Sequence, residues 1–183
     1  MPGSISGQEH LIETNIRWLR QASTLLDGVS DAAYATPPPG LAPHCVGGHM
    51  RHILEFYGCY LEGAASGAID YDARQRDPVL ETSRLAAQDR IHATIERLQS
   101  QASFPGDSTL RVRPEDSMAC DGPAPFLVSS MGRELQVLSS HTIHHFALIS
   151  VVLRAHGVPV DPDFGMAPST LRYLAGRRAA EAA

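Results

Sequence analysis

Two histidines one helical turn apart are the residues of this sequence with the clearest chemical meaning. His141 and His145 lie in an apolar-periodic run, residues 131–154, that has neither Gly nor Pro after Arg133. The run predicts a helix. Its geometry places both imidazoles on one face, close enough to bind one metal ion. The same face should point into the protein interior, because it also carries Met131, Leu138, Leu148 and Val152.

A second histidine-rich segment covers residues 44–55, and six of the nine histidines fall in these two windows. One histidine on an apolar face is more often a hydrogen-bonded core residue than a ligand. Several buried imidazoles without partners, however, cost about 1–3 kcal/mol each. A shared cation would supply the partners. If the two helices are neighbours, His52 can join His141 and His145 around one ion and leave an open fourth coordination position.

Three neutral imidazoles suit Zn²⁺ best, with Ni²⁺, Fe²⁺ and Mn²⁺ as alternatives. An ion with an open position can activate water, a thiol or a carbonyl group. No Glu follows His141, so the His-Glu-x-x-His pattern of zincin proteases is absent and proteolysis is disfavoured.

Three neighbouring side chains are candidates for catalytic or supporting roles. Glu55 follows His52 by three residues and is placed to orient a ligand or to act as a base. Glu134 precedes His141 by two turns, about 10 Å, which suits the mouth of a cavity. His144 points to one side of the pair as a hydrogen-bond partner. A cap, a surface ion pair or a packed ring explains each of these residues equally well.

The remaining periodicity predicts an all-α fold. Helices are expected at 8–26, 46–65, from 81 or 82 to 100, from a cap at 129 or 130 to about 156, and from 169 or 170 to the C-terminus. Residues 108–113 and 125–128 suggest a short hairpin, with Cys120 between them. The charged segment 66–78 is interpreted as a solvated crossover in preference to the rim of a site. A single helical-bundle domain over residues 1–183 follows.

Composition limits the classes of function. A chain of 183 residues that is 43% hydrophobic can bury one core. The net charge of −5 argues against nucleic-acid binding. The complete lack of Lys excludes Schiff-base chemistry and a P-loop. Three cysteines and no apolar run of membrane-spanning length predict a reduced, cytoplasmic protein without a membrane partner.

The two histidine segments resemble those of a known superfamily. Gly-Gly-His-Met-Arg-His-Ile-Leu-Glu (47–55) and Ser-His-Thr-Ile-His-His-Phe-Ala-Leu-Ile (140–149) are similar to the corresponding segments of the DinB-like superfamily, which includes the YfiT-like metalloenzymes. Ile-Asp-Tyr-Asp-Ala-Arg-Gln-Arg-Asp (69–77) and Phe-Gly-Met-Ala-Pro-Ser-Thr (164–170) are similar to one bacterial branch of it. The resemblance extends over nearly the whole chain.

This resemblance implies a four-helix bundle with non-sequential packing and a three-histidine divalent metal site. Matched residue by residue, the ligand from the second helix is His52, with His49 as the alternative, and the pair from the fourth helix is His141 and His145. Members of the superfamily with known activity use the metal to activate low-molecular-weight thiols such as bacillithiol, mycothiol or glutathione, in transfer or isomerisation reactions.

The sequence therefore favours a metal-dependent enzyme that acts on a small-molecule substrate or thiol, of the thiol transferase or isomerase kind, with metal-assisted hydrolysis as a second reaction type. The alternative from another class is a non-catalytic helical module that binds metal for stability or stress sensing, with a homodimer as one form of it.

Overall fold

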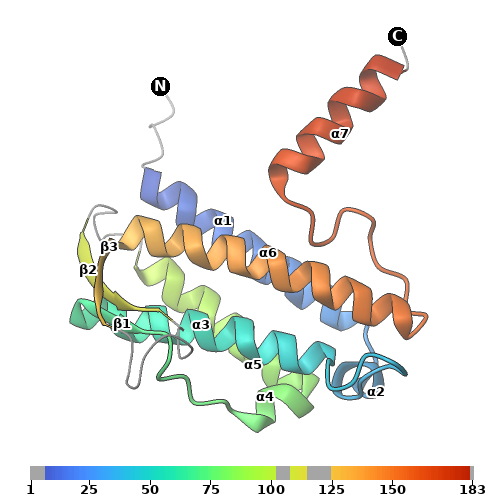
Figure 1. Cartoon of the computed structure of the whole chain (residues 1–183), viewed down its shortest axis with the longest axis horizontal. Helices are drawn as coiled ribbons and strands as arrows, with labels where there is room; N and C mark the ends of the chain where they lie inside the picture. The colour runs from blue at the N-terminus through green and yellow to red at the C-terminus, as the bar shows by residue number, and fades with distance from the viewer. Residues whose placement is uncertain (1–6, 102–107, 115–124, 182–183) are drawn as a thin grey trace.

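Four long helices form the body of the protein. The computed structural model describes residues 7–101, 108–114 and 125–181. The long helices lie side by side in Figure 1 and are α1 (Gly7–Asp27), α3 (Val46–Ser66), α5 (Arg84–Ser100) and α6 (Met131–Ala155). Both α1 and α3 contact α5 and α6. Around the group the helices thus follow in the order α1, α5, α3, α6, which differs from their order in the chain.

Side-chain caps set where several helices begin. The Cys45 thiol accepts a hydrogen bond from the Gly48 amide at 3.2 Å and starts α3, and Ser130 starts α6. The hydroxyl of Ser83 caps α5, so this helix begins later than the predicted position 81 or 82. Two short helices, α2 (Asp31–Ala35) and α4 (Pro78–Thr82), were not predicted, because each is too short to show a period.

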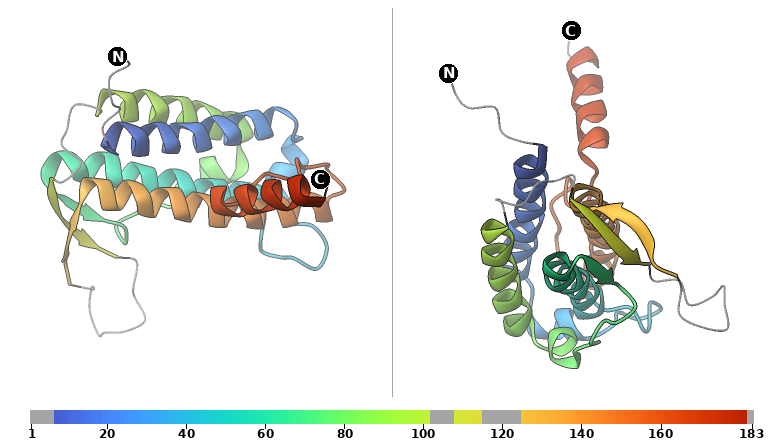
Figure 2. Two further views of the ribbon diagram at one scale, coloured as in Figure 1. Left: turned by 90° about the horizontal axis from the view of Figure 1, so that it is seen from above. Right: turned by 90° about the vertical axis from the view of Figure 1, so that its left-hand side faces the viewer.

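A small sheet adds to the predicted helical class. The predicted hairpin is confirmed as β2 (Thr109–Arg113) paired antiparallel with β3 (Leu127–Ser130). A further strand, β1 (Ala68–Asp70), pairs in parallel with β2 and lies where the sequence suggested only a crossover. The chain is mostly helical but not purely α. Figure 2 shows the sheet at the end of the molecule where α3 finishes and α6 starts. Cys120 lies outside the described residues.

The α3–α6 contact is central to the core. Tyr57 of α3 and Leu138 and Phe146 of α6 are fully buried. Met131, Leu138 and Val152 are buried as predicted, whereas Leu148 is 36% exposed, so its assignment to the inward face was wrong. The inward stripe of α6 is thus narrower than expected.

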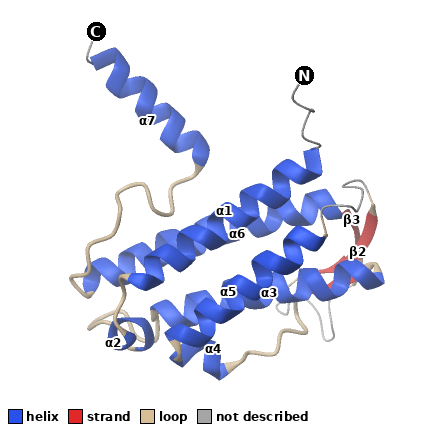
Figure 3. Ribbon diagram, turned by 180° about the vertical axis from the view of Figure 1, so that it is seen from behind, coloured by secondary structure: helices blue, strands red, loops and turns tan. Residues whose placement is uncertain are grey.

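The C-terminal helix α7 (Pro168–Glu181) stands away from the other helices in Figures 1 and 3 and buries none of its residues. The loop before it is held on α6, where Phe164 stacks on Phe146 with ring centroids 4.6 Å apart. Gly165 has a φ of +75°, and a Cβ there would lie 2.7 Å from the Ala147 amide nitrogen, so only glycine fits. No helix in the described ranges is both long enough and apolar enough to cross a membrane.

Candidate metal centre

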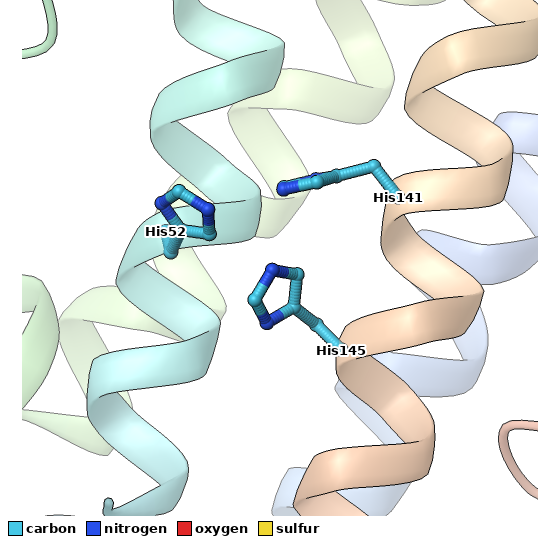
Figure 4. Close-up of side chains that lie close together, drawn as sticks. All are labelled: His52, His141 and His145. Atoms are coloured by element: carbon cyan, nitrogen blue, oxygen red, sulfur yellow. The ribbon is translucent and has the colours of Figure 1, made fainter. Parts of the chain in front are cut away.

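His52, His141 and His145 come together between α3 and α6. Each offers a ring nitrogen, and these three atoms all lie within 4.8 Å of one another. Figure 4 shows the rings turned toward a common space, one from α3 and two from adjacent turns of α6. The ring centroids are 4.5–4.8 Å apart. The helical spacing of four residues on α6 and the α3–α6 packing together create this cluster.

The outer ring nitrogens identify which atoms face inward. Nδ1 of His145 lies 3.1 Å from Nδ1 of His49, and Nδ1 of His52 contacts the Arg74 guanidinium. Nδ1 of His141 is buried and has no hydrogen-bond partner among the described residues. For His52 and His145, whose Nδ1 atoms make these contacts, the nitrogen left for a shared ion is Nε2. His49 lies behind His145 and does not belong to the cluster of three.

Burial keeps these imidazoles neutral. Desolvation is the main cause that lowers the pKa of His52, His141 and His145 to about 3, and their mutual repulsion when charged lowers each further. The Arg74 guanidinium adds to the lowering at all three. Desolvation also lowers the pKa of His49. At neutral pH each ring is therefore uncharged and has one unprotonated nitrogen, as metal binding requires.

The donor set fits a divalent ion of the zinc type. Three neutral imidazoles with solvent on one side match the ligand set of catalytic zinc sites. Tetrahedral coordination at Zn–N distances of about 2.0–2.1 Å requires nitrogens about 3.3 Å apart.

Aromatic and carboxylate groups support the cluster from one side. The Phe56 ring stacks on His141 with centroids 4.1 Å apart, and Tyr71 stacks on the other face of Phe56 at 4.8 Å. The Tyr71 hydroxyl donates to Glu134 Oε2 at 3.0 Å, and Ser129 donates to Oε1 at 2.5 Å. Glu134 is buried, and both of its carboxylate oxygens accept hydrogen bonds.

The other sequence candidates occupy different positions. Glu55 is buried and accepts a hydrogen bond from the Asp77 amide at 2.6 Å, beside a smaller cavity that also contains Cys59. It lies outside the group of three histidines. His144 is on the cluster side, with its ring centroid 5.1 Å from that of His145. Burial raises the pKa of the Cys59 thiol to about 11, which leaves that thiol unreactive at neutral pH.

A cavity of about 620 Å³ opens beside the cluster. The three histidines, His144 and Glu134 line it, together with apolar side chains from α3, α6 and the sheet. Its volume is in the range of pockets that hold small molecules. Glu134, which the sequence placed at the mouth of a cavity, lines the same cavity as the histidines and is itself buried.

The sequence analysis did not identify Phe56, Tyr71 and Arg74, which pack on or around the histidine rings. Phe56 follows His52 by four residues, so helical spacing alone could have found it. Tyr71 and Arg74 belong to the segment interpreted as a solvated crossover, and the alternative weighed for that segment, the rim of a site, describes Arg74 correctly. Asp70 of the same segment instead forms an ion pair with Arg113 at 2.7 Å.

No family model matches the chain. Over 106 residues the chain is 35% identical to a protein named FK506-binding protein 5 from Rhizopus delemar. The aligned region is 58% of this chain and 27% of that protein, so the chain spans about a quarter of the relative's length.

Proposed function

We propose that this chain is a divalent-metal-dependent enzyme of the DinB-like superfamily that acts on a thiol or, in the alternative reaction, on water. The observation that carries the proposal is the convergence of His52, His141 and His145 within 4.8 Å at the edge of a cavity of about 620 Å³. A purely structural metal site is usually closed by a fourth protein ligand. Here the described residues offer three ligands and an adjoining space.

The bundle proposed for the superfamily is supported by the contacts between the long helices. Consecutive long helices α1 and α3 both pack against α5 and α6. That arrangement is non-sequential, and it brings the second long helix beside the fourth. The His49 alternative has less support, because His49 contacts His145 from behind.

A bound divalent cation would supply Lewis acidity that favours the ionised form of a coordinated thiol or water. The protein side of the chemistry is orientation and proton handling. His49 fixes the ring of His145 through the contact between their Nδ1 atoms, and Phe56 fixes the ring of His141 by stacking. His144 lines the cavity and is the side chain best placed to accept a proton from substrate.

The two carboxylates have different parts in this proposal. Glu134 holds Tyr71 and Ser129 in the wall of the cavity and has both oxygens engaged, so it serves to position that wall. Glu55 is directed to the Asp77 amide, and its contribution is to fix the segment that carries Arg74. Neither carboxylate is needed as a ligand.

Metal analysis of protein purified without a histidine tag or added ions tests the proposal. We expect about one divalent ion per chain, lost in His52→Ala, His141→Ala and His145→Ala. His92→Ala is the matched control, since His92 lies on the surface of α5 near Ser23 and should leave the metal content unchanged. A wild-type chain that takes up no ion at saturating Zn²⁺ overturns the proposal.

A second measurement separates the enzyme from the non-catalytic module. Metal-loaded protein is mixed with bacillithiol, mycothiol or glutathione, and thermal stability and metal-centred spectra are followed. Thiol coordination supports the transferase or isomerase type of reaction. If the metal raises the melting temperature but the ion accepts neither thiol nor exchangeable water, the non-catalytic stabilising or sensing role replaces the enzymatic one.

A further inference from the structure

The cavity beside the three histidines extends along α6. Arg133, Val137, His141 and His144 line it from successive turns of that helix. Eight residues separate Arg133 from His141, which is about 12 Å of helix. The cavity is therefore elongated, with the histidine cluster at one end and Arg133 toward the other.

The wall opposite α6 is largely apolar. Phe56, Val112 and Pro114 line it together with Leu127 and Val128 of β3. Leu127 is 56% exposed and Val128 is 82% exposed. Large apolar side chains on an edge strand beside a cavity are typical of a surface that an apolar ligand covers.

Besides the histidines, the cavity is lined by one acidic and one basic side chain, Glu134 and Arg133. Glu134 already accepts hydrogen bonds from Tyr71 and Ser129. Arg133 is exposed, and its guanidinium forms no ion pair within the described part of the chain. Arg133 thus supplies positive charge that no carboxylate of those residues neutralises, in a chain whose net charge is −5. A guanidinium at the end of an apolar cavity suits a carboxylate or another planar anion.

We propose that the cavity binds an elongated, mainly apolar molecule with a donor atom, such as a thiol, at the histidine end and an anionic group held by Arg133. The donor end of this assignment rests on the proposed metal function. The apolar body and the anionic end rest on the cavity wall and on Arg133 alone. Arg133 is accordingly the residue that selects acids over neutral analogues of the same length.

The test uses the full chain loaded with Co²⁺ and a series of ω-mercaptocarboxylates, from 3-mercaptopropionate through 8-mercaptooctanoate to 11-mercaptoundecanoate. The charge-transfer absorption between thiolate and Co²⁺ reports binding. We expect affinity to rise about fourfold per added CH₂ and to stop rising once the chain spans the cavity. Arg133→Gln should weaken 8-mercaptooctanoate about fivefold and leave 8-mercapto-1-octanol unchanged. Arg154→Gln, an exposed arginine at the other end of α6, is the matched control.

Failure of the metal function and failure of this inference give different results. If Co²⁺ does not bind, the same variants are titrated calorimetrically with octanoate and 1-octanol in the absence of metal. If wild type then binds octanoate more tightly than 1-octanol and Arg133→Gln does not, the anionic end of the proposal stands and the donor end at the histidines is withdrawn. Equal binding of acid and alcohol by wild type and by Arg133→Gln, with or without metal, overturns the inference. An affinity that is the same for short and long ω-mercaptocarboxylates also overturns the inference.

Discussion

Arg74 and a metal ion make opposing demands on His52. A guanidinium only donates hydrogen bonds, so the Arg74 contact requires Nδ1 of His52 to be the acceptor. The ring is neutral, and its single proton must then be on Nε2, the nitrogen on the side of His141 and His145. An ion bound there needs the Nε2 lone pair, so the proton of His52 must move to Nδ1. The protonated Nδ1 and the Arg74 guanidinium would then be two donors that face each other without an acceptor. The Arg74 contact and metal binding therefore exclude each other.

This competition has a magnitude that can be measured. A hydrogen bond to a charged group contributes about 1.5–3 kcal/mol. Arg74 is half-buried, so the lower figure applies. Replacement of Arg74 by Gln removes the contact and offers an amide oxygen that can accept from a protonated Nδ1. We expect Arg74→Gln to bind Zn²⁺ about tenfold more tightly than wild type, as measured by competition with a chromophoric chelator.

Arg76→Gln is the control for this experiment, because Arg76 is exposed and lies in the same segment. Its Zn²⁺ affinity should equal that of wild type. Unchanged or weakened affinity in Arg74→Gln would refute the competition. So would ¹⁵N chemical shifts that place the proton of His52 on Nδ1 in the metal-free wild type, whatever the affinities are.

Three further predictions follow from the contacts around the cluster. His49→Ala should lower Zn²⁺ affinity by about 10–100-fold without loss of stoichiometric binding, because His49 orients a ligand and is not one; calorimetry distinguishes this from the complete loss expected for His52→Ala. The free energy of unfolding of the metal-free protein should fall as the pH falls from about 6.5 toward 3. The reason is that the histidines of the unfolded chain bind protons in this pH range, whereas the three buried imidazoles of the folded chain have pKa values of about 3 and do not. Urea unfolding at several pH values measures the change in the free energy of unfolding with pH, and a free energy that does not change contradicts the prediction. Asn15→Ala should lower the free energy of unfolding by about 2–4 kcal/mol in urea, because it removes buried hydrogen bonds to Leu135 and from Tyr57; a change below 1 kcal/mol would show that these bonds contribute little.

The long helices and the histidine cluster could be predicted from the sequence because both depend on local spacing. An apolar period of 3.6 residues identifies each long helix, and four residues between His141 and His145 fix their common face. The pairing of that face with His52 required only that the second and fourth long helices be neighbours. Family resemblance supplied that neighbour relation, since no local pattern does.

What the sequence did not predict depends on contacts between distant segments. Strand β1 has three residues and no alternation, and it exists because its backbone pairs with β2, some forty residues later. Arg74 reaches His52 only because the segment between α3 and α4 folds back along α3. The side chain of Glu55 accepts a hydrogen bond from the Asp77 amide of the same segment. Its direction could not be predicted from its position three residues after His52.

A buried polar network fixes the rotation of the two helices that carry the histidine cluster, α3 and α6, about their own axes. Tyr57 of α3 donates to Asn15 of α1 at 2.7 Å and lies 3.3 Å from the hydroxyl of Thr142 on α6. Asn15 in turn donates to the Leu135 carbonyl at 3.0 Å. Thr142 is the residue next to His141, so the network fixes the face of α6 that turns toward α3. Apolar packing alone tolerates small rotations of a helix about its axis, whereas these bonds lose their geometry when it rotates. A substitution in the network that leaves the chain folded should therefore loosen metal binding without contact with any ligand.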